Sequence, residues 1–304
     1  MQSLNISNSP PLDSRPQSLP RWLKRNVPKG NANHFTAKLI AQLGLQTVCD
    51  HAKCPNRMEC YAQKTATFLI LGNICTRGCR FCSVEKGAPR PIDPDEPRRV
   101  AEAVVKLGLK HVVITCVTRD DLSDGGAEHF HQTISELRRA TTATIEVLPS
   151  DFAGNMAAVH RLLDAAPEVY NHNAETVPRL FPVVRDRRAN YARTLEMFRH
   201  IHRRNPIIAL KTGLMLGLGE TTEELLDTLA DLLEAGCGML TLGQYLQPTP
   251  AQTPVVRYLP PEEFEHLGRL ARQMGFDRVA SGPFVRSSYH AREMCLKPKQ
   301  REPK

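Results

Sequence analysis

Hydrophobic positions along this chain alternate between short continuous runs and stretches spaced at helical intervals. The continuous runs, rich in β-branched residues, predict buried strands at 67–71, 111–117, 144–148, 168–171, 207–214 and 239–242. The amphipathic stretches predict helices at 97–107, 127–140, 154–165, 188–203, 221–235 and 260–274. A capping box at 221–224 marks the start of the fifth helix. Strand and helix therefore alternate six times, which predicts a parallel sheet with right-handed crossovers.

Six strand–helix units, where a closed barrel has eight, predict an α/β protein built on a partial, open (β/α)6 barrel. We expect this barrel at residues 65–280. A cysteine-rich extension at 31–64, with a short helix at 35–45, should precede it, and a C-terminal segment at 281–304 should follow it. The sequence contains no linker or internal repeat that would divide its 304 residues into independent domains.

The charge of the chain is concentrated at its two ends. Net charge is +8, and a polar leader at 1–30 has five basic residues against one acidic, while 286–304 has six against two. The middle of the chain is therefore neutral, which argues against a nucleic-acid partner, because such folds carry positive charge on a structured face. The basic ends are either solvated tails or an attraction for an acidic partner protein.

Neither a membrane nor a secreted location is indicated. No run approaches the roughly 18 consecutive apolar residues of a membrane span. The first twenty residues are polar and rich in proline, unlike a secretory signal. We therefore expect a cytoplasmic protein.

Six of the nine cysteines fall within 34 positions, in two triplets. Cys75, Cys79 and Cys82 form a C-x3-C-x2-C motif directly after the first predicted strand. Three thiolates on one loop suit a cubane iron–sulfur cluster with one iron left open, whereas structural zinc prefers four ligands. The dispersed cysteines, Cys116, Cys237 and Cys295, are expected to pack as small apolar side chains.

A C-x3-C-x2-C motif at the end of the first strand of a partial barrel resembles the radical S-adenosylmethionine superfamily. The resemblance implies that the open iron binds S-adenosylmethionine and that one electron cleaves it to a 5′-deoxyadenosyl radical. Barrel chemistry gathers at the carboxyl ends of the strands. We therefore predict contacts to S-adenosylmethionine, or to the charge of the cluster, from Thr118, Gly125, Gly126, Asn173, Glu175, Arg185 and Lys211. For each of them the alternative is a structural role in a turn or at the barrel rim.

Two further motifs narrow the resemblance to the lipoyl synthase family. Cys49, Cys54 and Cys60 form a C-x4-C-x5-C triplet upstream, and Arg-Ser-Ser-Tyr-His occupies 286–290. The resemblance covers about residues 28–291 and implies a second [4Fe–4S] cluster on the upstream triplet. Its fourth ligand would be the oxygen of Ser288, and its sulfides would be consumed as the sulfur source. His51, inside the triplet, is more readily explained as a solvated loop residue.

The family resemblance also implies a reaction and its partners. Two sulfur atoms would be inserted at C6 and C8 of a protein-bound N6-octanoyl-lysine, giving the lipoyl group. The catalytic residues would be Cys75, Cys79, Cys82 and Ser288. The partners would be octanoylated carrier proteins (lipoyl domains of 2-oxoacid dehydrogenases and the glycine cleavage H protein) and, as electron donor, ferredoxin or flavodoxin. We expect a monomer, since one chain contains every motif.

Three alternatives need separate tests. Biotin synthase also inserts sulfur by radical chemistry, but it lacks the upstream triplet. A two-cluster electron carrier would be shorter and would hold each cluster with four cysteines. A basic metal-containing nucleic-acid binder is disfavoured by the neutral middle of the chain. Neither of the last two classes should bind or cleave S-adenosylmethionine.

Overall fold

The computed structural model describes residues 18–24 and 32–295. Most of the predicted leader, and the basic end of the C-terminal segment from residue 296, lie outside these ranges. Within them, no helix is both long and apolar enough to cross a membrane.

A sheet of eight strands forms the centre of the fold, in the order β1-β2-β5-β6-β7-β8-β9-β10. The strands are β1 (Gln46–Thr47), β2 (Thr67–Ile70), β5 (His111–Cys116), β6 (Thr144–Leu148), β7 (Val169–Asn171), β8 (Ala209–Leu216), β9 (Met239–Gln244) and β10 (Arg278–Gly282). All neighbouring strands from β2 to β10 pair in parallel, whereas β1 runs antiparallel to β2. In the described residues no ladder joins β10 back to β2, so the barrel is open on that side.

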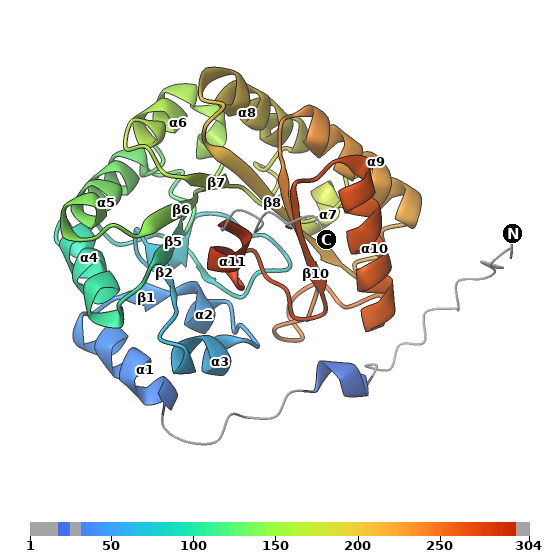
Figure 1. Ribbon diagram of the computed structural model, residues 1–304, viewed down its shortest axis with the longest axis horizontal. Coiled ribbons are helices and arrows are strands. Elements are labelled where there is room, and N and C mark those ends of the chain that lie inside the picture. Colours follow the sequence, from blue (N-terminus) through green and yellow to red (C-terminus); the bar gives the residue numbers. More distant parts are fainter. Residues whose placement is uncertain (1–17, 25–31, 296–304) are drawn as a thin grey trace, which may run out of the picture.

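The helices that follow the strands form an outer layer around the sheet (Figure 1). They are α4 (Glu96–Leu107), α5 (Ala127–Ala140), α6 (Met156–Leu163), α8 (Tyr191–Arg204), α9 (Thr222–Glu234) and α10 (Pro261–Met274). The capping box of α9 is formed as predicted: Thr221 Oγ1 accepts the Glu224 N–H, and the Glu224 carboxylate accepts the Thr221 N–H. The six predicted strand–helix units are confirmed, and β10 adds a seventh parallel strand that was not predicted.

An N-terminal extension packs beside the first barrel strand. It contains α1 (Ala32–Gln42), α2 (Val48–His51) and α3 (Arg57–Ala62). The Tyr61 side chain is almost fully buried, and its hydroxyl donates to Asp50 at 2.6 Å and lies 2.7 Å from the Thr47 hydroxyl. Tyr61 therefore fastens α3 to the start of α2, which fixes the two helices that carry Cys49 and Cys60.

The C-terminal segment closes the amino-terminal end of the barrel. After β10 the chain runs back along the barrel interior and forms α11 (Ala291–Cys295), which lies within the ring of strands in Figure 1. Met294 packs against Val169 and Met239, the first residues of β7 and β9. The remaining short elements are η1 (Arg21–Leu23), β3 (Ile74–Cys75), β4 (Glu85–Lys86), η2 (Phe152–Gly154) and α7 (Phe181–Val184).

Candidate functional site

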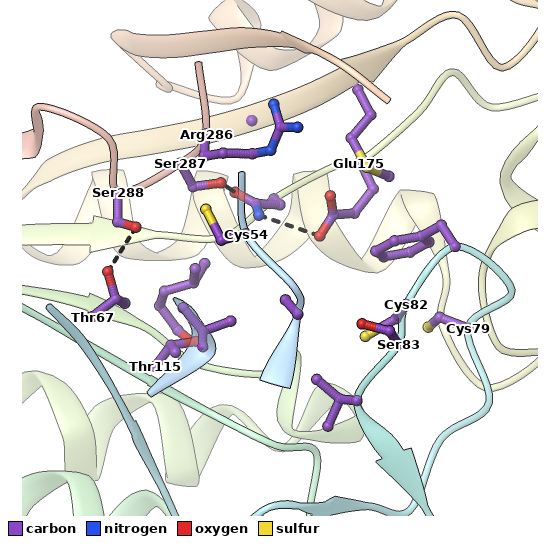
Figure 2. A pocket seen from close by; sticks show the side chains of 18 of the residues that line it. Cys54, Thr67, Cys79, Cys82, Ser83, Thr115, Glu175, Arg286, Ser287 and Ser288 are labelled. Atoms are coloured by element: carbon purple, nitrogen blue, oxygen red, sulfur yellow. Dashed lines mark hydrogen bonds between the residues drawn. The ribbon is translucent and has the colours of Figure 1, made fainter. Parts of the chain in front are cut away.

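A cavity of about 490 Å³ occupies the barrel interior, between the carboxyl ends of the strands, the extension and the C-terminal segment. Five of the six clustered cysteines line it: Cys49, Cys54, Cys75, Cys79 and Cys82. Ser287 and Ser288 line it too, whereas Cys60, on α3, is not among the lining residues. In Figure 2, Cys54 and the two serines lie on one side of the view, and Cys79 and Cys82 lie together on the other. The structure thus brings together segments about 240 positions apart in the sequence.

The loop of the second triplet is held at both ends by backbone pairing. Strand β3, which contains Cys75, pairs with β4, and the Gly87 N–H donates to the Cys75 carbonyl at 3.1 Å. In the middle of the loop, the Asp186 carboxylate accepts the Gly78 N–H at 2.6 Å, and Cys79 Sγ accepts the Asp186 N–H at 3.3 Å. These contacts fix the shape of the loop mainly through backbone groups and the Asp186 carboxylate. The contact that involves a thiol uses Cys79 Sγ as an acceptor, a role that a metal-bound sulfur can keep.

The thiols form two electrostatic groups. Burial raises the pKa of Cys82 to about 11, and the nearby Cys79 and Cys75 contribute to the rise. Burial likewise raises the pKa of Cys49 to about 11, with a contribution from Cys54. Soft sulfur donors, gathered in two sets and protonated until a metal replaces the proton, fit iron–sulfur clusters. The donor sets are therefore chemically suited to the two clusters that the motifs predict.

The C-terminal motif is tied to the extension and to the barrel by hydrogen bonds. Ser288 Oγ accepts from the Thr67 hydroxyl at 2.8 Å, and the Ser287 hydroxyl donates to Asn173 Oδ1 at 2.7 Å. On the extension side, the Asn56 amide donates to the Phe284 carbonyl at 2.7 Å. Both serines consequently face the cavity that Cys49 and Cys54 line.

Four of the predicted contacts for S-adenosylmethionine also line this cavity: Thr118, Asn173, Glu175 and Arg185. The Asn173 amide donates to Glu175 Oε1 at 3.2 Å, and the Arg185 guanidinium lies 3.5 Å from the same oxygen. Burial raises the pKa of Glu175, while Arg185 and Asn173 oppose that rise. The Glu175 backbone has φ of +70°, and its N–H donates to the Gly213 carbonyl of β8 at 2.9 Å. A left-handed backbone at a non-glycine residue, held by its neighbours, is a common feature of binding sites.

Gly125 and Gly126 are not among the lining residues of this cavity. Gly126 is the N-cap of α5 with φ of +90°, and a Cβ there would lie 2.3 Å from Leu71 Cδ1. Its N–H donates to Asp124 Oδ1 at 2.9 Å. Glycine is needed at this position because the helix begins in close contact with the end of β2, which is a structural role.

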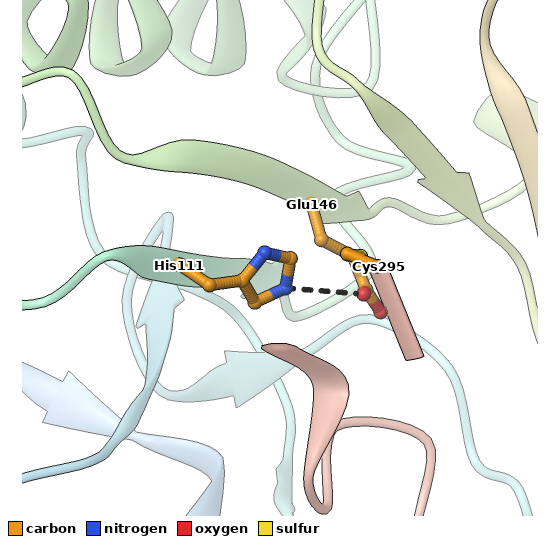
Figure 3. A group of neighbouring side chains, drawn as sticks. All are labelled: His111, Glu146 and Cys295. Atoms are coloured by element: carbon orange, nitrogen blue, oxygen red, sulfur yellow. Dashed lines mark ion pairs between the residues drawn. The ribbon is translucent and has the colours of Figure 1, made fainter. Parts of the chain in front are cut away.

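Lys211 is not among the lining residues either. It is fully buried in the barrel, and its ammonium group lies 2.9 and 3.1 Å from the two carboxylate oxygens of Glu146. His111 and Cys295 complete this polar group near α11 (Figure 3), and the His111 ring lies 3.4 Å from the Glu146 carboxylate. A histidine, a carboxylate and a thiol are metal-ligand types, but the ammonium of Lys211 already occupies a cation position on this carboxylate. The structure therefore gives Lys211 the role of neutralising a buried charge.

Two residues that the sequence did not single out belong to the site. His172 lines the cavity and is 4% exposed, and its Nδ1 lies 3.1 Å from the Pro149 carbonyl. Its Nε2 is buried and has no hydrogen-bond partner within residues 18–24 and 32–295. Burial, and then the charge of Arg185, lower the pKa of His172 to about 4, so the ring is neutral at pH 7. The sequence feature that could have identified His172 as a site residue is its position directly after a predicted strand, beside Asn173.

The second is Arg77, inside the C-x3-C-x2-C motif. Its guanidinium is buried and forms ion pairs with Asp120 at 2.8 Å and Asp151 at 2.7 Å. Arg193 contacts the other oxygen of Asp151 at 2.9 Å. The network anchors the cysteine loop to the segments that follow β5 and β6. The spacing of the cysteines did not distinguish Arg77 from the other non-cysteine positions of the motif.

Comparisons with known proteins agree with this geometry. The sequence model described as the Radical SAM superfamily matches residues 69–232. A lipoyl synthase of Rhodopirellula baltica is 60% identical over 279 residues, which are 91% of this chain and 88% of that protein. A lipoyl synthase of Caldanaerobacter subterraneus subsp. tengcongensis is 51% identical over 272 residues, which are 90% of this chain and 95% of that one. Streptococcus suis SuiB bound to S-adenosylmethionine has a similar fold, with a TM-score of 0.56 at 11% identity over 74% of this chain and 53% of SuiB.

Proposed function

This chain belongs to the lipoyl synthase family of the radical S-adenosylmethionine superfamily, and from that premise we propose that it inserts two sulfur atoms, at C6 and C8, into a protein-bound N6-octanoyl-lysine. The family predicted from the three motifs is thereby confirmed. The observation that carries the proposal is one cavity lined by Cys75, Cys79 and Cys82, by Cys49 and Cys54 of the upstream set, and by the two serines. Biotin synthase, the nearest alternative, would need only the Cys75–Cys79–Cys82 set.

We assign the two cysteine sets to two [4Fe–4S] clusters with different tasks. Cys75, Cys79 and Cys82 would hold the cluster that, together with S-adenosylmethionine, supplies the radical chemistry needed to break an unactivated C–H bond. Cys49, Cys54 and Cys60, with the oxygen of Ser288, would hold the second cluster, which is a substrate because its sulfides are the sulfur delivered. The Thr67 hydroxyl supports this role for Ser288, since it fixes the position of Ser288 Oγ.

The residues between the two sets are suited to hold S-adenosylmethionine. The carboxylate of Glu175 and the amide of Asn173 would accept from its ammonium and hydroxyl groups, and Arg185 would meet its carboxylate. Thr118 completes the predicted set, and we add His172, whose neutral Nε2 can accept a hydrogen bond from the ligand. His172 is buried and the other four residues are half-buried, so an unpaired acceptor there is costly, which favours a ligand that satisfies it.

The octanoyl chain would lie between the two cluster sites. Apolar side chains line the cavity, among them Leu69, Leu148 and Leu214. Each CH₂ group buried there would contribute about 0.8 kcal/mol to binding. The partners would be octanoylated carrier proteins, as predicted, with ferredoxin or flavodoxin as electron donor. All nine cysteines are free thiols, which supports the cytoplasm as the location because it keeps thiols reduced.

The test is a product analysis with matched variants. After anaerobic reconstitution we expect about eight irons and eight sulfides per chain, as two cubane clusters require. Mass spectrometry of an octanoylated lysine peptide should detect the lipoyl product, alongside a count of 5′-deoxyadenosine. Cys79→Ala should lose both products, whereas Cys54→Ala should still form 5′-deoxyadenosine without transferring sulfur. Lipoyl product at normal yield from Cys54→Ala would contradict the role of the second cluster.

A further inference from the structure

The outer side of the Cys75–Cys82 loop is covered by a segment of which the proposed chemistry uses only Arg185. This segment consists of α7 (Phe181–Val184) and the turn after it, up to Arg188. The Val184 carbonyl accepts the Arg80 N–H at 2.8 Å, and Asp186 bonds both the Gly78 N–H and Cys79 Sγ. Arg188 donates to the Thr76 carbonyl at 2.5 Å. The turn is thus in direct contact with the loop that carries three cluster ligands.

Exposed cations gather on this segment and on the loop beneath it. Arg80 and Arg187 are exposed, and their side chains have no hydrogen bond or ion pair to any described residue. Arg188 is partly exposed and forms ion pairs with Asp186 at 2.9 Å and Asp120 at 3.2 Å. Val183, on α7, is 52% exposed. We call Arg80, Val183, Arg187 and Arg188 the loop-side surface.

The positive charge of the loop-side surface exceeds the negative charge of the aspartates that pair with it. A hollow of about 310 Å³ adjoins it, and four arginines line that hollow: Arg77, Arg187, Arg188 and Arg193. Asp120, Asp151 and Asp186 pair with three of them, which leaves the charge of Arg187. With the unpaired Arg80, two cationic charges therefore face solvent near Cys79, and the exposed apolar side chain of Val183 belongs to the same segment. Exposed apolar side chains beside charged residues are typical of a protein interface.

We propose that the loop-side surface docks an acidic one-electron carrier protein, a flavodoxin or ferredoxin, for reduction of the cluster held by Cys75, Cys79 and Cys82. The inference rests on the proposed function, because only cleavage of S-adenosylmethionine requires that electron. One electron leaves the carrier, which is oxidised, and enters the cluster, which is reduced; no bond is made or broken. Complementary charge would steer the encounter and fix its orientation.

The position of the surface favours an electron donor over the octanoylated carrier. Gly78, next to Cys79, is exposed and has no side chain, so a partner can approach the loop closely there. Electron transfer weakens steeply with distance, which makes this the productive face for a donor. None of the four loop-side residues lines the main cavity, which the octanoyl-lysine must enter. A carrier protein is therefore expected at a different face.

The experiment measures donor binding directly, with the cluster-reconstituted protein and an oxidised flavodoxin as the probe. We compare the wild type, the double variant Arg80→Glu/Arg187→Glu, and the control Arg203→Glu. Arg203 is likewise exposed and unpaired among the described residues, but lies in the last turn of α8, at the opposite end of the barrel. We expect about tenfold weaker binding by the double variant near 0.1 M salt, shrinking to about twofold near 0.5 M, and no more than a twofold change in the control.

A kinetic readout separates docking from chemistry. Formation of 5′-deoxyadenosine driven by flavodoxin should fall about as much as the affinity, while formation driven by dithionite, which needs no docking, should stay at the wild-type rate. Equal flavodoxin affinity in the wild type and the double variant would overturn the proposal. So would weaker affinity for an octanoylated carrier protein with unchanged flavodoxin affinity. If the wild type failed to cleave S-adenosylmethionine with either reductant, the proposed function would fail, whereas the affinities would still report on the surface.

Discussion

The hydroxyl of Thr67 donates a hydrogen bond of 2.8 Å to Ser288 Oγ, across 221 positions of the sequence. Thr67 is the first residue of β2, and Ser288 lies in the segment that follows β10. β2 lies next to the edge strand β1, and β10 is the opposite edge strand, so the bond links the two sides of the open barrel where no strand ladder does. A residue of a rigid strand thereby positions the serine that the family resemblance assigns to the second cluster.

Removing this hydroxyl should separate the two halves of the reaction. Thr67→Val keeps the shape of the side chain but deletes the donor, at a cost of about 1 kcal/mol in unfolding free energy. We expect a several-fold loss of lipoyl product with 5′-deoxyadenosine formation retained, because the other cluster site lies on a different loop. Ser288→Ala should act in the same direction, and Thr67→Ser should restore the product. Normal sulfur transfer by Thr67→Val, measured by mass spectrometry of the peptide, would show that Ser288 does not need this contact.

His172 offers a second test, of the binding of S-adenosylmethionine. The Pro149 carbonyl fixes the proton on Nδ1, which leaves Nε2 as a neutral, buried acceptor of a ring that lines the cavity. His172→Phe should weaken binding of S-adenosylmethionine about tenfold, as the loss of one buried hydrogen bond predicts, and His172→Gln should recover part of it. Because the pKa is about 4, the ring stays neutral from pH 6 to pH 8, so its contribution should be flat over that range. Equilibrium binding of S-adenosylmethionine at three pH values measures both the effect of the variants and the pH dependence. Equal affinity in His172→Phe and the wild type would show that His172 does not contact the ligand.

The sequence pattern predicted the strand–helix units and missed the elements that depend on pairing. Strands with continuous apolar runs, such as β5 and β6, begin at the predicted residues because their burial is encoded locally. Strand β10 contains Arg278, Ser281 and Gly282 and is only half buried, so its pattern is weak and its pairing with β9 defines it. The two-residue strands β3 and β4 are too short for any periodicity.

For the site residues too, the sequence predicted what is encoded locally and missed what depends on strand pairing. Spacing alone identified the cysteine sets, because ligand spacing on one loop is a local property. Spacing did not determine the level, meaning the height along the barrel axis, at which an inward-facing side chain lies. Lys211 pairs with Asn171 in the ladder, which puts it beside Glu146 and away from the cavity. That level depends on strand register, which a single sequence does not contain.

The Lys211–Glu146 pair yields a stability prediction. Both side chains are fully buried, so Lys211→Met would leave the Glu146 carboxylate in the core without its lysine, with Asn171 and His111 as its remaining polar neighbours. We expect a loss of about 3–5 kcal/mol in unfolding free energy, most of it recovered by the double variant Glu146→Gln/Lys211→Met. Urea denaturation measures both effects. Affinity for S-adenosylmethionine should be unchanged in the double variant; a large loss there would instead support the ligand contact that the sequence predicted for Lys211.

The last prediction concerns acid stability and the anchor of the cysteine loop. Burial raises the pKa of Asp151, but the hydrogen bond and the charge of Arg77 outweigh it and lower the pKa from 3.8 to about 2. A carboxyl whose pKa is depressed in the folded state stabilises that state above its unfolded pKa, and the contribution disappears as the pH falls through the folded value. Asp151 should therefore contribute about 2 kcal/mol at pH 7, lost between about pH 4 and pH 2.

Asp151→Asn tests this sign, because it keeps the size of the side chain and removes the charge. Unfolding free energies of the wild type and the variant should differ by about 2 kcal/mol at pH 7 and pH 5, and converge below pH 4. The difference at each pH is the measured quantity, and both proteins are unfolded without bound clusters so that unequal cluster content does not contribute. Arg77 lies two residues from both Cys75 and Cys79, so the variant should also lower the iron retained by this loop at pH 7. A stability difference that grows as the pH falls would show that Asp151 is protonated in the folded protein and that Arg77 is anchored by Asp120 alone.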